Sequence, residues 1–233
     1  MKRFYKEAGV GPAGAGFAIL IDGRPVRTPA RRPFELPGRA LAEAIAEEWN
    51  AQGDKVDPRS MPLGGLANAA IDRVAPDPAA FAAGLALYGE SDLLCYRAEH
   101  PEPLVRRQAE TWDPLLEWGR RRFDARFDVV HGVVHRPQPE ATLDQLRRAV
   151  AARDPFALAA LAPLVTISGS LLIALALDEG AIDLLAAWAA ATLDETWQAE
   201  QWGEDALAAA ALEARRREFE TGFRFLSLLR ARC

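Results

Sequence analysis

The chain has 233 residues, of which 50% are hydrophobic and 26% are charged. This length and composition are sufficient for an apolar core in one large domain or in two small ones. A formal net charge of −5 and a pI near 5.4 give no overall attraction for phosphate backbones, so a nucleic-acid partner is not expected. The sequence has two cysteines, too few for a disulfide framework, which indicates a reducing compartment such as the cytoplasm.

The first part of the chain, residues 1–60, is predicted to form a small α+β domain. The β-forming segments Phe17–Ile21 and Arg24–Thr28 flank Asp22-Gly23, a dipeptide that favours a two-residue hairpin turn because it tolerates positive φ. A helix is predicted over Arg39–Gln52. The stripe of this helix that can cover one face of the antiparallel sheet consists of Leu41, Ile45, Trp49 and Gln52.

The second part, residues 61–233, is predicted to form a larger all-helical domain, because its Ala, Leu and Arg residues recur with helical spacing. Pro114 lies inside one of these helices and predicts a break or kink there. Alternating β-branched residues over Val129–Val134 predict an extended connector. The predicted helices are Gly65–Val74, Asp77–Gly89, Pro103–Asp124, Thr142–Arg153, Asp154–Ala162, Pro163–Asp178, Ala181–Gln201 and Glu204–Arg232.

One long segment without charges, Phe156–Leu177, has the length needed to cross a bilayer of roughly 30 Å. Pro163 and the run Ser168-Gly169-Ser170 interrupt it, and no basic cluster flanks it to set an orientation. We therefore predict two buried helices, the second with Pro163 in its first turn, where a missing N–H costs nothing. A membrane-associated factor is the alternative interpretation of this segment.

The patterns that usually mark catalytic or metal sites are incomplete in this sequence. Gly9–Gly14 has the G-x-G-x-x-G spacing of a dinucleotide site, but a hairpin rather than a helix should follow it, so we predict a flexible turn. His131 and His135 lie in an extended segment without a third ligand nearby. Ser168–Ser170 fits helix packing, and Cys95 fits a small buried hydrophobe. No catalytic residue, cofactor or metal is therefore expected.

The segment Leu193–Asp205 combines carboxylates with tryptophans. On a helix, Asp194 and Gln198 share one side, whereas Glu195 and Trp202 lie roughly two turns apart on another. Aromatic residues beside carboxylates are good interface material, above all for an arginine-rich partner. A solvated helix end with tryptophans in the core is one alternative. A small hydrolase that uses Asp194 and Glu195 as acid and base is another, although no cofactor motif supports it.

Five segments carry a resemblance that extends in order along nearly the whole chain. They are Arg3–Lys6, Ile21–Pro29, Glu47–Trp49, Asn68–Asp72 and Leu193–Asp205. Together they resemble the assembly chaperones of the F-type ATP synthase alpha subunit, as a bacterial relative of mitochondrial ATP synthase assembly factor 2. The resemblance implies a chaperone, not an enzyme, that binds newly made alpha subunit, shields the surface that the beta subunit later occupies, and leaves when the catalytic head assembles.

The resemblance also implies what the chain should lack and where it should work. No cofactor, nucleic acid, membrane span or small-molecule substrate is expected. The chain should be a bacterial, cytoplasmic protein, whereas the eukaryotic relatives are mitochondrial. The net charge also argues against a nucleic-acid partner, and the two cysteines and the lack of a presequence-like N-terminal segment also favour the cytoplasm.

The family's acidic functional element matches this sequence at Asp194 and Glu195. The resemblance therefore implies a partner-binding surface that consists of Asp194, Glu195, Gln198, Trp202, Glu204 and Asp205. Trp49 matches a tryptophan that the family needs for its fold. Because it is the last large residue of the stripe over the sheet, we interpret it as structural, since a charge at this place would be buried without a partner.

Overall fold

The computed structural model describes residues 2–132, 134–203 and 205–231. The chain forms two compact units: the first contains the residues up to Pro78, Asp154–Ala160 and the residues from Arg224 onward, and the second contains the remainder. A small antiparallel sheet comes first and helices follow, which confirms the α+β fold class. The predicted boundary between residues 60 and 61 lies inside the first unit, so the division into domains 1–60 and 61–233 stays a prediction.

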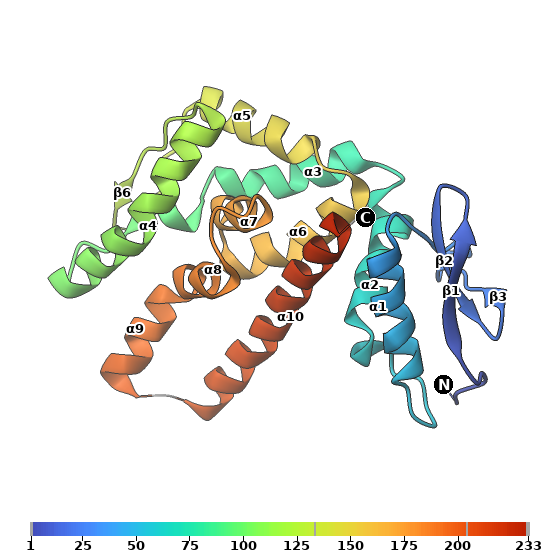
Figure 1. Ribbon diagram of the computed structural model, residues 1–233. Helices are drawn as coiled ribbons and strands as arrows, with labels where there is room; N and C mark the ends of the chain where they lie inside the picture. The colour runs from blue at the N-terminus through green and yellow to red at the C-terminus, as the bar shows by residue number, and fades with distance from the viewer. Residues whose placement is uncertain (1, 133, 204, 232–233) are drawn as a thin grey trace. The chain divides into compact units, whose positions relative to one another are not determined.

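The sheet of the first unit is built around one central strand. Its strands are β1 (Ala8–Ala13), β2 (Gly16–Ile21), β3 (Arg24–Pro25) and β4 (Glu35–Leu36). Strand β2 pairs antiparallel with each of the other three (Figure 1). Asp22 and Gly23 join β2 to β3 with φ angles of 47° and 77°, which confirms the predicted hairpin turn.

The prediction of a flexible turn over Gly9–Gly14 is wrong, because most of this segment forms strand β1. Strand β1 pairs along its whole length with β2, and the turn between them is limited to Gly14 and Ala15. Small residues suit this hairpin because the backbone of β4 lies close to β2. A Cβ atom on Gly16 would lie 2.2 Å from the carbonyl oxygen of Leu36, so only glycine permits this approach of β2 to β4.

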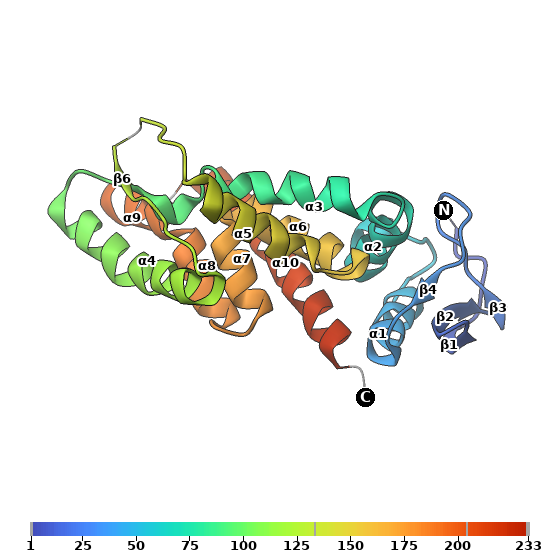
Figure 2. The same ribbon diagram turned by 90° about the horizontal axis from the view of Figure 1, so that it is seen from above.

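Helix α1 (Arg39–Asn50) packs on one face of the sheet, beside β1, β2 and β4 (Figure 2). Leu41 and Ile45 are fully buried in this contact, as the predicted stripe requires. Trp49, the third member of the stripe, is only half-buried. Asn50 ends the helix, and its side-chain amide donates to and accepts from the backbone of Ala8, 2.8 Å away in both cases, which fixes β1 to the helix.

Helix α2 (Pro62–Ala69) follows a short 3₁₀ turn, η1 (Pro58–Ser60), and continues into a π-helical turn, η2 (Ala70–Val74). Glu48 of helix α1 caps α2, because its carboxylate accepts the N–H groups of Leu63 and Gly64 at 2.8 Å. Burial raises the pKa of the Glu48 carboxyl above its ordinary value, against the lowering effect of these two hydrogen bonds.

The second unit is mostly helical. Its elements are α3 (Pro78–Ala86), η3 (Leu87–Gly89), η4 (Leu93–Cys95), β5 (Tyr96–Arg97), α4 (Glu102–Phe123), β6 (Val130–His131), α5 (Glu140–Ala151), α7 (Leu171–Asp178), α8 (Leu184–Ala191) and α9 (Leu193–Trp202). Helices α6 (Pro155–Ser168) and α10 (Ala206–Arg230) contribute residues to both units. Strand β6 pairs in parallel with β5, which agrees with the extended connector predicted around it. Val133, within that connector, lies outside the described residues.

The core of the second unit surrounds α7, in which every residue from Leu171 to Leu177 is fully buried. Helix α7 contacts α4 and α8, and Figure 1 shows it above α8 and to the right of the α4 label. Its N-terminus is held by Asp92, a buried carboxyl that accepts hydrogen bonds from Ser170 Oγ at 2.7 Å and from the N–H of Leu172 at 3.0 Å. The same carboxyl accepts the N–H of Leu94 at 3.1 Å. Burial raises the pKa of Asp92 to about 6.

The two buried helices predicted for Phe156–Leu177 are present, but the break between them is not at Pro163. Helix α6 continues through Pro163 to Ser168. The chain breaks at Gly169, whose φ of +65° suits glycine, and Ser170 then caps α7 by accepting the N–H of Ile173. Among the residues that the structure describes, no helix combines the length and the apolar character that a bilayer crossing requires.

Two further helix predictions need correction. Helix α4 runs unbroken through Pro114, where Glu110 and Pro114 are both exposed, so water can bind the carbonyl group that the proline leaves without a donor. The helix predicted over Ala181–Gln201 is two helices, because Thr192 ends α8 and begins α9. The hydroxyl of Thr192 donates to the carbonyl oxygen of Trp188 at 2.8 Å and so competes with the helical backbone pattern.

Candidate functional site

Helix α9 and the first turns of α10 enclose a groove of about 520 Å³, which we call the α9–α10 groove. From α9 it is lined by Glu195, Gln198, Ala199 and Trp202, and beyond that helix by Gly203, Asp205, Ala208, Ala209, Ala211, Leu212 and Arg215. The groove therefore contains four of the six residues predicted to bind a partner. Glu204, the fifth, lies outside the described residues.

Asp194, the sixth predicted residue, is not among the described residues that line the groove. It is half-buried, and its Oδ1 accepts a hydrogen bond from Gln108 Nε2 at 2.8 Å. Gln108 is buried on helix α4, and its own Oε1 accepts the N–H of Ala98 at 2.9 Å. The carboxylate of Asp194 therefore fastens α9 to α4, whereas its neighbour Glu195 lines the groove.

The other carboxylates of α9 are paired with arginines from distant segments. Arg215 of α10 binds both carboxylate oxygens of Glu195, with its Nη1 3.0 Å from Oε1, and this hydrogen bonding raises the pKa of the guanidinium. Arg107 of α4 binds Glu200 in the same way, at 2.6 and 3.1 Å, and lowers the pKa of that carboxyl. The negative charge of these two side chains is therefore balanced within the molecule.

The walls and rim of the groove are apolar to an unusual degree for an exposed surface. Small alanines of α10 line one wall, so a second helix or an extended chain can approach its backbone closely. Trp202, which lines the groove at the end of α9, is 79% exposed. Leu207 in the first turn of α10 is 82% exposed and precedes the lining residue Ala208, but it is not itself among the described residues of the lining. Large apolar side chains that gather at a concave surface commonly mark a protein-interaction site.

The geometry does not assemble an acid and base from Asp194 and Glu195. Each carboxylate is engaged by a different donor, Gln108 in one case and Arg215 in the other, and only Glu195 lines the groove among the described residues. Within the described ranges, no three His, Cys, Asp or Glu side chains lie close enough together to hold a metal ion. The groove offers a surface for binding, and Asp194 and Glu195 do not act on it as a pair.

The residues of α10 that complete the groove are absent from the sequence prediction. A run of small residues, Ala208–Ala211, between two leucines is a signal that a helix face can be approached closely. Arg215, one of three consecutive arginines, fits a solvated helix face when the sequence is read alone. Its role as the partner of Glu195 depends on the fold, because the two residues lie 20 positions apart on different helices.

Trp49 lies in the first unit, far from this groove in sequence. Its indole packs edge-on against the ring of Tyr5, with 5.5 Å between the ring centres, and the Tyr5 hydroxyl donates to the Trp49 carbonyl oxygen at 2.6 Å. The indole also lines a cavity of about 350 Å³, which we call the Trp49 cavity. A wholly structural role, as interpreted from the sequence, stays a prediction.

Comparison with known proteins gives consistent matches over nearly the whole chain. The family described as ATP12 chaperone protein matches residues 2–120. The crystal structure of Atp12 from Paracoccus denitrificans is 46% identical, with a TM-score of 0.94, and the match covers 98% of each chain. An aspartate-to-lysine variant of the Paracoccus protein has the same identity and TM-score over 98% of this chain and 97% of that chain. A candidate chaperone from Agrobacterium tumefaciens is 44% identical, with a TM-score of 0.93, over 98% of this chain and 86% of that chain.

Proposed function

This chain belongs to the ATP12 chaperone family, and on that premise we propose that it binds the newly made alpha subunit of the F-type ATP synthase before the catalytic head assembles. Membership identifies the chain as a chaperone. The alpha subunit as its client, and release when the beta subunit takes over the shielded surface, are the proposal. A bacterial, cytoplasmic setting is part of it, as the family resemblance implies.

The α9–α10 groove is the observation that carries this proposal. A chaperone for an assembly intermediate has to cover apolar surface that another subunit will bury later, so it needs an apolar surface of its own that is open in the free state. Trp202 in the lining of the groove provides such a surface at 79% exposure, and Leu207, which precedes the lining residue Ala208, adds a second apolar side chain at 82% exposure. Glu195, Gln198 and Asp205 place polar groups around it, and a polar rim is typical of interfaces that form and separate.

We propose that the carboxylates of the groove contribute less to the binding of the client than the number of acids in this segment indicates. An arginine of the client would have to compete with Arg215 for Glu195. The carboxylate of Asp205 accepts the N–H of Ala208 at 2.9 Å and caps α10, yet it is exposed and can bind a cation as well. We infer that the apolar contact supplies most of the binding energy and that the acids mainly guide the approach of the client.

The test is the capture of purified alpha subunit, followed as suppression of its aggregation, in the absence of nucleotide and with a metal chelator present. The double variant Trp202→Ser and Leu207→Ser should bind the alpha subunit about tenfold more weakly, because central aromatic residues are commonly hot spots. Its thermal unfolding should match that of the parent, because both side chains are exposed in the free protein.

Leu185→Ser is the matched control for this experiment. Leu185 on α8 is 69% exposed but is not among the described residues that line the groove. This variant should capture the alpha subunit as well as the parent does. Equal capture by the double variant and the control would show that the groove is not the docking surface. Failure of the parent to capture the alpha subunit under any of these conditions would remove the proposed client.

A further inference from the structure

The segment between β3 and β4 in the first unit is held in place by η2. Asp72 accepts a hydrogen bond from Thr28 Oγ1 at 2.7 Å and another from the N–H of Ala30 at 3.1 Å. The guanidinium of Arg32 donates to the carbonyl oxygen of Ile71 at 2.8 Å. These three hydrogen bonds join residues that lie 39 to 44 positions apart in sequence. This segment, residues 26–34, is therefore a fixed wall and not a loose loop.

The Trp49 cavity lies against this wall. Its apolar lining consists of Val26, Pro29, Phe34, Trp49, Val56, Pro58 and Met61. Polar groups come from Arg27, Thr28 and Asn68, and the surface is completed by Gly64 and Gly65 on α2. At about 350 Å³ the cavity falls within the range of sites that bury a ligand or an inserted side chain.

Among the described residues that line the cavity, Arg27 is the only charged one. The segment Arg24–Arg32 holds four arginines, and none of them forms an ion pair within the described part of the chain. Arg27 lines the cavity and donates to the carbonyl oxygen of Arg31 at 2.9 Å, but no carboxylate is among the described residues of the lining. The amide of Asn68 likewise has no hydrogen-bond partner among the residues that the structure describes. The cavity thus combines apolar walls with open hydrogen-bond donors.

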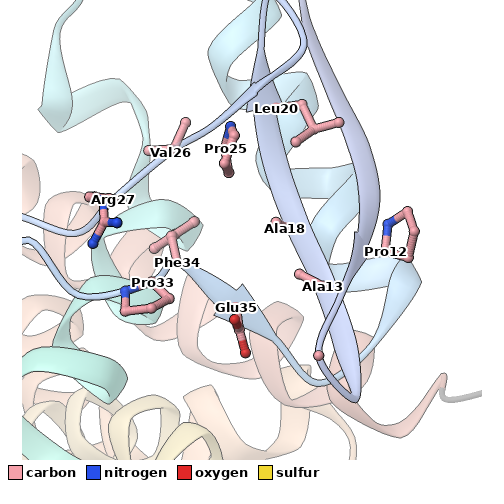
Figure 3. Close-up of a pocket in the computed structure, with 11 residues that line it drawn as sticks. Pro12, Ala13, Ala18, Leu20, Pro25, Val26, Arg27, Pro33, Phe34 and Glu35 are labelled. Carbon is pink, nitrogen blue, oxygen red and sulfur yellow. The ribbon is translucent and has the colours of Figure 1, made fainter.

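A second hollow of about 460 Å³ lies over the outer face of the sheet (Figure 3). Val26, Arg27 and Phe34 line both hollows. Figure 3 shows Arg27 on the segment that faces Ala18 and Leu20 of β2 across this second hollow. Arg27 is therefore at the rim of both, where its guanidinium can reach a carboxylate that approaches from either side.

We propose that the Trp49 cavity is a second docking surface for the client, separate from the α9–α10 groove. Its occupant is an extended segment of the client that inserts an apolar side chain into the cavity and pairs a neighbouring carboxylate with Arg27. The inference rests on the proposed function for the identity of the client. The occupant's chemistry comes from the cavity itself, because apolar walls select an apolar side chain and an unpaired guanidinium selects an acid.

The first arm of the test fills the cavity. A Cβ atom built on Gly65 meets no other atom within 4 Å, so Gly65→Phe can be accommodated on helix α2 and would occupy the space beside Trp49. Gly84→Phe is the matched control, since Gly84 is also a helical, exposed glycine with open space around its Cβ position, and it is not among the described residues that line the cavity. The affinity for purified alpha subunit should fall about tenfold for Gly65→Phe and stay unchanged for Gly84→Phe.

The second arm reverses the charge. Arg27→Glu should weaken capture of the alpha subunit about tenfold, because it would face the proposed carboxylate with a like charge. Arg24→Glu is the control, since Arg24 is exposed on β3 and is not among the described residues that line the cavity. Thermal unfolding of all four variants should match the parent, which separates lost binding from lost folding.

The outcomes separate this inference from the proposed function. Full capture by Gly65→Phe, with a parent that binds the alpha subunit, would overturn the second docking surface and leave the proposed function standing. Loss with Gly65→Phe but not with Arg27→Glu would overturn the carboxylate contact. A parent that does not bind the alpha subunit would remove both proposals together.

Discussion

Helix α9 and the arginine segment 24–32 carry opposite charges, and they differ in how those charges are used. The carboxylates of Asp194, Glu195 and Glu200 are each engaged by a donor from another helix. The four arginines of the segment 24–32 have no acidic partner in the described part of the chain. The sequence marks α9 as the charged binding element, whereas among the described residues the segment 24–32 has more charged side chains without an ion pair or hydrogen-bonded partner of opposite charge than α9 has.

The charge that a surface offers to a partner is the charge of those side chains that are not already paired within the molecule. An acid that is already bound by an arginine or an amide offers a partner little, because the new contact must replace an existing one. An unpaired guanidinium at the rim of an apolar cavity is free to bind. Five predictions test how much the internal contacts of these groups contribute to the stability of the second unit and of the first.

The largest loss of stability should follow the replacement of Asp92, a buried carboxyl that accepts three hydrogen bonds. Asp92→Ala removes the acceptor for the hydroxyl of Ser170 and for the N–H groups of Leu94 and Leu172. The free energy of unfolding, measured in urea, should fall by about 4 kcal/mol, because buried donors without acceptors destabilise the folded state. Asp205→Ala removes an exposed cap and should cost about 1 kcal/mol. Equal losses for the two variants would contradict the prediction.

The pH dependence of the same carboxyl has a definite sign. The pKa of Asp92 is raised from 3.8 to about 6, chiefly by burial. A raised pKa in the folded state means that the folded chain holds this proton more tightly than the unfolded chain. The stabilisation is therefore present below about pH 3.8 and is lost as the pH rises through about 6. As the pH rises over this range, the free energy of unfolding of the parent should move closer to that of Asp92→Asn, which has no carboxyl to titrate at this position. A difference that widens with rising pH would contradict a raised pKa of Asp92.

The next effect should come from the contact that fixes Asp194. Gln108→Leu leaves the N–H of Ala98 without its acceptor and Asp194 without its donor. The free energy of unfolding should fall by about 2 to 3 kcal/mol, because Gln108 is buried. Gln198→Leu, at an exposed position on the same helix as Asp194, should change stability by less than about 0.5 kcal/mol. If Gln108→Leu is no more destabilising than this control, the hydrogen bond between Gln108 and Asp194 does not stabilise the fold.

A somewhat smaller effect is expected in the first unit. Trp49→Arg removes the edge-on contact with Tyr5 and adds a cation beside Arg27, which already lacks an acidic partner. The free energy of unfolding should fall by about 2 kcal/mol and the folded yield should be lower, since aromatic packing and charge balance are both disturbed. Trp49→Phe should keep most of the stability. A melting temperature of Trp49→Arg equal to that of the parent would show that the indole is needed only for binding.

The smallest effect concerns the ion pair across the α9–α10 groove. Glu195 and Arg215 are about half and two-fifths exposed in their side chains, so their pairing should contribute less than about 1 kcal/mol. Glu195→Arg and Arg215→Glu should each be slightly destabilising, and the double variant should recover the loss. A double-mutant cycle measures this coupling, which should shrink in about 1 M salt. A coupling that salt leaves unchanged would mean that the pair is shielded from water.

The sequence by itself determined the features that depend on short-range preferences. Asp22-Gly23 predicted the hairpin because few residues adopt positive φ at low cost, and the structure has the turn there. The apolar run that ends at Leu177 predicted buried helices, because no polar face exists to meet water, and every residue of α7 up to Leu177 is fully buried. Family membership followed from five short segments, since their order along the chain is itself specific.

Tertiary structure alone decided which groups meet and which stay open. Glu195 and Arg215 are 20 residues apart, Thr28 and Asp72 are 44 apart, and Arg107 and Glu200 are 93 apart. Helical periodicity gives the direction of a side chain from its own axis, but not the position of another helix against it. The glycine-rich segment became a strand for a similar reason, because its pairing energy comes from β2 and not from its own weak propensity. The paired acids of α9 and the open arginines beside the Trp49 cavity are therefore properties of the fold.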